Sequence, residues 1–371
     1  MKCCEKCFMH GVIKDTIRSL SNKACCDFCG SQNVFVYDIS NDSGLDVKFS
    51  GIFNVFRKRD ELPEDYPSGK LFLIKDVFAN QYNVFSDVFP KERVVDFLEE
   101  LLKSNFPDKV ELLRETVGVS EYTSSSFLNS SSLLKEFTWE EFITYIRCNN
   151  RFHSRHINFD VFKEYIEGLT RTIKENSIFY RARISNNEEL IKKKMYAPPA
   201  YLASAGRANS EGISHLYLAK DIETVIKEIR PKTKDKIYIG NFRLKHDIKV
   251  VDFRKLKTIS IFDFEDNPAK YIVNYDNFRK LSEEISKPIK TGDSILDYLP
   301  TQFFVDLIKS INDFDMREED IRFSGIEFKS TLSTTGHNLM VFSQNCFECI
   351  EISKTEINAV SYNHEVQPLE D

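Results

Sequence analysis

The spacing of hydrophobic residues predicts helices in the middle of the chain. Between residues 94 and 102, valine and leucine recur at intervals of three and four, which places them on one face of a helix. A capping pattern at residues 138–141 predicts the start of a second helix, and the apolar spacing over 159–174 predicts a third. The serine-rich segment 124–132 and the turn-rich segment 41–69 predict loops. We therefore expect a mainly helical middle.

Beyond residue 177 the apolar runs become short and lie between turn-forming residues, as in a mixed α+β domain. A helix is predicted to begin after Asp221, which suits an N-cap, and to end before Pro231. Another helix is predicted to open at Thr301. The predicted strands cover residues 179–183, 215–219, 237–242, 248–253, 325–330 and 338–342.

The composition narrows the class of protein. The chain has 371 residues. This length exceeds what a single hydrophobic core usually supports, so we expect several structural units. No stretch approaches the ~18 consecutive apolar residues of a membrane span, and the N-terminus lacks the apolar core of a secretory signal. A net charge of −6 does not favour nucleic-acid binding. We therefore expect a soluble, cytoplasmic protein that binds neither a membrane nor nucleic acid.

Six of the nine cysteines lie in the first 29 residues, in two clusters that each contain a C-x-x-C pattern. Four thiolates at this spacing suit one tetrahedral Zn²⁺, and a site closed by four protein ligands is structural rather than catalytic. Cys3 and Cys25 duplicate the first ligand of each pair, and we interpret them either as spare or as supporting the ligands without binding the ion. A further C-x-x-C at residues 346–349 has no partner pair, which predicts buried thiols. The predicted zinc ligands are Cys4, Cys7, Cys26 and Cys29.

Several motifs follow one another in the second half of the chain. They are FYRAR at 179–183, GRAN at 206–209, LYLA at 216–219, PTQ at 300–302 and GIEFKS at 325–330, followed by Asn338. In this order, over residues 178–343, the chain resembles the RES domain family. The resemblance implies an ADP-ribosyltransferase-like fold and consumption of NAD⁺ by hydrolysis, phosphorolysis or transfer to a protein. It also implies a toxin or anti-phage effector restrained by an antitoxin or another regulatory protein. The long N-terminal extension departs from the small toxins of the family, but its paired cysteines and helical middle resemble the N-terminal region of longer RES proteins.

The resemblance and the chemistry together assign candidate site residues. Cleavage of the nicotinamide–ribose bond passes through an oxocarbenium-like state that a carboxylate stabilises, which suits Glu228. Arginine binds pyrophosphate with two parallel hydrogen bonds, which suits Arg181 and Arg207. Tyr217 would stack on the nicotinamide or donate a hydrogen bond near it, and Ser330 would fix the amide or the ribose. We expect Glu228, Arg181 and Ser330 to be catalytic. The further candidates for NAD⁺ binding are Tyr180, Arg183 and Asn338.

Two other functions compete with this hypothesis. Arg147 and His153 have a spacing that resembles the Arg/His pair of HEPN ribonucleases, in which a histidine acts on a ribose hydroxyl. The local density of arginine and histidine also explains that spacing, and we favour a solvated helix end. The other alternative is a zinc-stabilised binding adaptor whose RES-like half is inactive. The predicted domains are a zinc-binding knuckle at 1–40, a mainly helical domain at 41–176 and a RES domain at 177–371.

Overall fold

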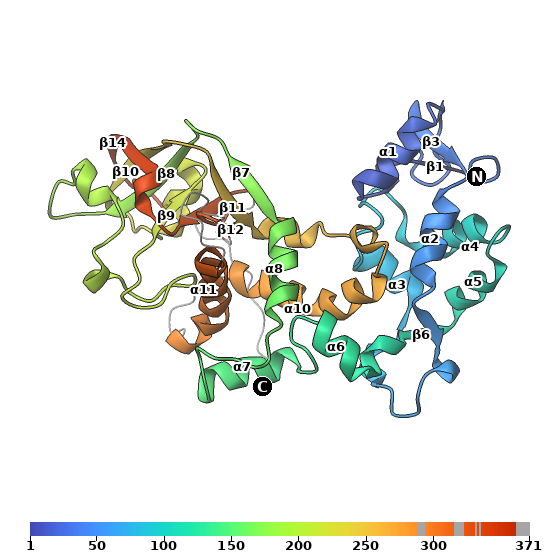
Figure 1. The fold of residues 1–371 in the computed structure, drawn as a ribbon. Coiled ribbons are helices and arrows are strands. Elements are labelled where there is room, and N and C mark those ends of the chain that lie inside the picture. Colours follow the sequence, from blue (N-terminus) through green and yellow to red (C-terminus); the bar gives the residue numbers. More distant parts are fainter. Residues whose placement is uncertain (288–293, 315–322, 331, 334, 361–371) are drawn as a thin grey trace, which may run out of the picture. The chain divides into compact units, whose positions relative to one another are not determined.

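The computed structural model describes residues 1–287, 294–314, 323–330, 332–333 and 335–360 (Figure 1). The chain divides into two compact units. Unit 1 comprises residues 1–142, 154–162 and 255–280, and unit 2 comprises residues 143–153, 163–254 and 281–371. The chain therefore passes from one unit to the other repeatedly along its length.

Unit 1 begins with a small antiparallel sheet whose strand order is β1-β3-β2. β1 ends at Cys4, and β2 ends two residues before Cys26, so the sheet holds the two cysteine clusters near each other. Ile13 and Ile17 of the intervening helix are buried one turn apart. The elements are β1 (Lys2–Cys4), α1 (Gly11–Ser19), β2 (Lys23–Ala24) and β3 (Val34–Asp38).

The rest of unit 1 combines helices with a second antiparallel sheet of order β4-β6-β5. The helix predicted between residues 94 and 102 is confirmed as α4, and its Leu98 and Leu102 are fully buried. The elements are α2 (Leu45–Phe53), β4 (Phe56–Lys58), β5 (Phe72–Leu73), α3 (Ile74–Asn80), α4 (Val94–Leu102), α5 (Pro107–Glu111), β6 (Thr116–Val119) and α6 (Ser125–Ser131).

Two predicted loops of unit 1 are wrong. The turn-rich segment contains α2 and β4, because Phe49 and Phe53 lie one turn apart and are buried in the core. The serine-rich segment contains α6, because the Ser124 hydroxyl accepts a hydrogen bond from the Phe127 amide at 3.3 Å and caps the helix. In both segments packing or capping outweighs a composition that is typical of loops.

Aromatic rings fill the core of unit 1. The ring of Phe97 on α4 lies 5.6 Å from Phe8, 5.6 Å from Phe28, 5.7 Å from Phe49 and 5.5 Å from Phe85, mostly edge to face. Phe8 and Phe28 belong to the cysteine-rich start of the chain, whereas Phe49 and Phe85 lie beyond it. One continuous cluster of buried residues therefore serves the cysteine-rich start, the helices that follow it and the later segment 261–272.

Unit 2 is built on an eight-stranded sheet whose order is β14-β10-β8-β9-β13-β12-β11-β7. Neighbouring strands are antiparallel except β11 and β12, which are parallel. The ladder between β8 and β9 is short, with the single register pair Tyr180 and Ala219. The strands are β7 (Thr170–Ile173), β8 (Ile178–Ile184), β9 (Leu216–Ala219), β10 (Lys236–Leu244), β11 (Ile248–Asp252), β12 (Gly325–Lys329), β13 (His337–Val341) and β14 (Phe347–Glu356).

The predicted α+β character of this half is confirmed, and each strand predicted between residues 179 and 342 is present. The helix predicted over 159–174 is wrong at its end, where α8 stops at Gly168 and β7 begins at Thr170. Thr170, Thr172 and Ile173 are β-branched, which favours a strand, and they pair with β11. The segment therefore joins the sheet and does not continue the helix.

The remaining helices are α7 (Trp139–Cys148), α8 (Phe159–Gly168), α9 (Ile222–Glu228), α10 (Pro268–Ser286) and α11 (Leu299–Phe314). The predicted N-cap of α9 is confirmed, because Asp221 Oδ1 accepts a hydrogen bond from the Thr224 amide at 2.7 Å. α10 was not predicted, and its residues up to Lys280 belong to unit 1. Among the described residues, no helix is long and apolar enough to cross a bilayer.

Candidate active site

A cavity of about 470 Å³ lies in unit 2. This volume falls in the range of small-molecule sites, which is roughly 300–1,000 Å³. Five cationic side chains and one carboxylate line it, in a chain whose net charge is −6, so the cavity is a local positive site that suits an anionic ligand. The charged lining residues are Arg181, Arg207, Arg230, Lys287, Lys329 and Glu228.

Glu228 is the last residue of α9, and two neutral donors hold its carboxylate. Its Oε1 atom accepts a hydrogen bond from the Ser330 hydroxyl at 2.6 Å and another from Asn338 Nδ2 at 2.8 Å. Its Oε2 atom accepts none from the described residues. Ser330 follows β12 directly and Asn338 lies on β13, so two neighbouring strands and a helix end fix this carboxylate. Three predicted site residues therefore meet at one point.

Arg181 lies on β8 and reaches the same cavity. Its Nη1 atom is buried and has no hydrogen-bond partner among the described residues. Burial lowers the pKa of this guanidinium to about 10, and the nearby charge of Arg183 adds to the shift. The side chain thus stays positively charged at pH 7 with part of its donor capacity unused. A buried, charged donor of this kind is costly unless a ligand pairs with it.

Arg207 lies in the loop between β8 and β9 and also lines the cavity. Its Nη1 atom donates to the Glu284 carbonyl at 2.6 Å, and its guanidinium lies over the Tyr298 ring, 5.6 Å from the centroid. These contacts fix the direction of the side chain.

Tyr217 on β9 contributes its ring to the lining, and its hydroxyl donates to Asn209 Oδ1 at 2.6 Å. Burial raises the pKa of Tyr217 above its ordinary value. The hydroxyl is therefore a neutral donor that is already engaged within the protein.

Three predicted site residues, Tyr180, Arg183 and the buried Ser330, are not among the lining residues of this cavity. Tyr180 packs on the face of the sheet that α9 covers, beside Ala182 and Val225. Arg183 is exposed and donates to the Lys194 carbonyl at 2.5 Å. The strand alternation that turns Arg181 towards one face turns Tyr180 towards the other.

Sequence reasoning assigned no role to several residues of this region. Asn209 and Gln302 fall inside the GRAN and PTQ motifs, and both are buried hydrogen-bonding residues of the cavity wall or its support. His215 lines the cavity with 5% exposure, and burial, helped by the charge of Lys309, lowers its pKa to about 4. The available signals were the motif positions of the two amides and the polar start of the strand that carries Tyr217.

The alternative ribonuclease pair lies elsewhere in unit 2. Arg147 Nη2 forms an ion pair with Asp297 at 3.0 Å, and the side chain of His153 is exposed. The Nε atom of Arg147 is buried and has no hydrogen-bond partner among the described residues, but the guanidinium is already paired with a carboxylate.

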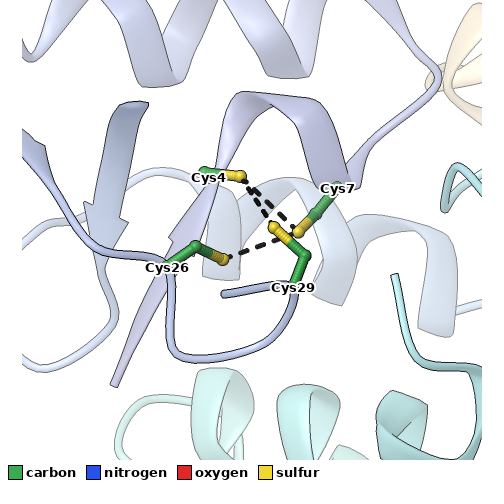
Figure 2. A group of neighbouring side chains, drawn as sticks. All are labelled: Cys4, Cys7, Cys26 and Cys29. Carbon is green, nitrogen blue, oxygen red and sulfur yellow. Dashed lines mark hydrogen bonds between the residues drawn. The ribbon is translucent and has the colours of Figure 1, made fainter. Parts of the chain in front are cut away.

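The four predicted zinc ligands come together in unit 1, and their sulfur atoms point towards one another (Figure 2). The Sγ–Sγ distances are 3.7 Å from Cys4 to Cys7, 3.5 Å from Cys4 to Cys29 and 3.6 Å from Cys7 to Cys26, and all four atoms lie within 4.8 Å of one another. Tetrahedral ligands at the usual Zn–S distance lie about 3.8 Å apart. The cluster therefore has dimensions that fit one Zn²⁺. Cys25 is exposed and lies outside this group.

Comparison with protein-family models matches residues 178–362 to the RES domain. The C-terminal half of the chain is a RES domain. The RES segment begins at the first residue of β8 and contains all the residues that line the cavity. The RES family is associated with NAD-utilising, toxin-like function. No curated protein and no solved structure gave a match.

Proposed function

We propose that the RES domain cleaves the nicotinamide–ribose bond of NAD⁺ with Glu228 as the catalytic carboxylate. The observation that carries the proposal is the fixed carboxylate of Glu228 in the same cavity as Arg181, whose buried Nη1 atom lacks a partner. A carboxylate that shares a cavity with a guanidinium whose Nη1 atom is unpaired matches a substrate that develops positive charge at the ribose and carries negative charge on its phosphates.

Glu228 would act electrostatically. When the bond between ribose C1′ and the nicotinamide nitrogen breaks, the bonding electron pair leaves with nicotinamide, and the ribose becomes oxocarbenium-like. Because Ser330 and Asn338 both donate to Oε1, the carboxylate is held before the reaction begins, and Oε2 is available to the ribose. An acceptor, which is water, phosphate or a protein side chain, then forms the new bond to C1′ with a lone pair and releases its proton to the solvent. Ser330 thus supports catalysis by holding the carboxylate.

Arg181 and Arg207 would bind the pyrophosphate. Both guanidinium groups line the cavity, and planar two-pronged donors match phosphate oxygens better than ammonium groups do. Tyr217 would offer its ring face to the nicotinamide, since its hydroxyl is occupied by Asn209. Asn338 takes part through Glu228.

The test is ¹H NMR of the purified full chain with NAD⁺, with and without phosphate, which follows free nicotinamide and identifies the ribosyl product. Glu228→Gln keeps the shape of the side chain and should lower kcat by roughly 10²–10³-fold. Glu223→Gln is the matched control, because Glu223 lies on the same helix, is exposed and pairs with Lys227. Wild-type turnover by Glu228→Gln would exclude the proposed role.

We also propose that Cys4, Cys7, Cys26 and Cys29 hold one structural Zn²⁺. Four thiolates leave no open coordination position, so the ion would stabilise unit 1 without taking part in chemistry. Three of the four ligands are buried, as in a closed structural site.

A cytoplasmic toxin or anti-phage effector is the biological role that this activity favours, with a regulatory protein or antitoxin as its partner. Depletion of NAD⁺ would stop growth, so the activity calls for restraint. Expression of the wild type should lower cellular NAD⁺, whereas Glu228→Gln should not. Constant NAD⁺ on expression of an active enzyme would count against this role.

A further inference from the structure

The loop that carries Arg207 is held by its carbonyl oxygens. We call residues 204–213 the Arg207 loop. Three side chains donate hydrogen bonds to its backbone carbonyls. Asn209 Nδ2 donates to the carbonyls of Ser204, Ser210 and Ile213 at 3.0, 3.1 and 3.0 Å. Gln302 Nε2 donates to the carbonyls of Gly206 and Asn209 at 2.7 and 2.9 Å. The single hydrogen of the Thr301 hydroxyl is shared between the carbonyls of Arg207 and, at 3.0 Å, Tyr298.

These three side chains are buried, with exposures of 6% for Asn209, 4% for Gln302 and 1% for Thr301. Buried amides are costly unless their donors and acceptors are paired. Here they are paired, because Asn209 Oδ1 accepts from Tyr217 and Gln302 Oε1 accepts from the Ser210 hydroxyl at 3.3 Å. A satisfied buried network of this kind fixes one backbone conformation.

The network also requires a close approach of the backbone. A Cβ atom at Gly206 would lie 2.7 Å from Asn209 Oδ1, inside the contact distance of real side chains. The amide of Gly206 donates to the carbonyl of Asn209 at 2.9 Å, which closes a tight turn around Arg207. The turn is therefore clamped from within by Asn209 and from α11 by Thr301 and Gln302.

We propose that Thr301 and Gln302 are positioning residues that hold the Arg207 loop in its NAD⁺-binding conformation. The inference rests on the proposed function, and it adds the residues that hold the backbone of Arg207 in position. The clamp fixes the backbone of Arg207, and Glu284 and Tyr298 fix its guanidinium. The loop thus meets the substrate already ordered, so binding does not have to supply the cost of ordering it. Neither residue contacts the reacting atoms in this scheme, so both should act on substrate affinity.

The experiment combines kinetics with hydrogen–deuterium exchange of the full chain. Gln302→Met keeps the length of the side chain and removes its donors, and Thr301→Val removes one hydroxyl with little change in volume. Ser310→Ala is the control on the same helix, where the hydroxyl donates to the Leu307 carbonyl within α11. Both test variants should raise the KM for NAD⁺ roughly tenfold, leave kcat within about twofold, and speed amide exchange of residues 204–213 in the absence of NAD⁺.

The outcomes separate this inference from the proposed function. An active wild type whose KM is unchanged in both variants overturns the inference, and so does a fall in kcat without a rise in KM. A wild type that leaves NAD⁺ intact refutes the proposed function instead. In that case exchange alone decides, because faster exchange at residues 204–213 supports the clamp and unchanged exchange overturns it. If Gln302→Met fails to fold, Thr301→Val carries the test.

Discussion

His215 should make unit 2 sensitive to acid. Its imidazole is buried, and burial together with the charge of Lys309 lowers its pKa from 6.5 to about 4. In the unfolded chain the pKa returns to about 6.5. As the pH falls below 6.5, His215 therefore binds a proton in the unfolded state but stays neutral in the folded state, and the free energy of unfolding decreases. The full loss is about 3 kcal/mol, of which about 2 kcal/mol is reached between pH 7.5 and pH 5.

The variant His215→Phe isolates this contribution. Phenylalanine keeps a planar ring beside Phe342, whose centroid lies 5.6 Å from that of His215, and it does not titrate. Urea denaturation at pH 7.5 and at pH 5 measures the free energy of unfolding. Hydrogen–deuterium exchange of peptides from β9 serves as the readout, so that the measurement reports on unit 2. The wild type should lose about 2 kcal/mol more than the variant on going to pH 5, because other titrating groups are common to both. An equal loss in the two proteins would refute the idea of a buried, neutral imidazole.

Three further predictions concern the two units. Cys26→Ser should abolish a zinc content of about one ion per chain and lower the melting temperature, whereas Cys25→Ser should do neither; elemental analysis and thermal denaturation measure both, and retained zinc in Cys26→Ser would contradict the proposed site. Arg181→Lys should raise the KM for NAD⁺ roughly tenfold, because lysine cannot reproduce two-pronged binding of phosphate; an unchanged KM in steady-state kinetics would remove Arg181 from the binding site. His153→Ala should leave NAD⁺ turnover unchanged, since the side chain is exposed and outside the cavity; RNA cleavage by the wild type that this variant loses would favour the ribonuclease alternative.

The strands and the cysteine site could be predicted because their signals are local. A run of apolar residues between turns is readable one segment at a time, and β8 to β13 lie where such runs occur. The two C-x-x-C patterns identify the four ligands directly, and the four sulfur atoms lie together as that spacing predicts. Glu228, Ser330 and Asn338 were named through a family resemblance, and the hydrogen bonds among them supply a physical reason for their grouping.

Other features depend on partners far away in the sequence. α2 forms in a turn-rich segment because Phe49 packs against Phe97 and Phe262, which lie 48 and 213 residues further along the chain. The Gln302 amide donates hydrogen bonds to a loop more than 90 residues earlier in the chain, and no local sequence pattern predicts these hydrogen bonds. Tyr180 and Arg181 are neighbours in one motif, yet only Arg181 lines the cavity, because adjacent residues of a strand face opposite sides.

The course of the chain limits how the proposed activity of the RES domain can be controlled. Residues 255–280 lie inside the RES segment, but they belong to unit 1, where Ile261, Phe262 and Tyr271 are part of the aromatic core. A protease that cut before residue 178 would therefore not release an intact RES domain, because residues 255–280 of that fragment would lose the core around them. Activation by removal of the N-terminal region, as in a zymogen, is at odds with this arrangement. Any restraint on the RES domain should instead be applied and lifted while the chain stays whole.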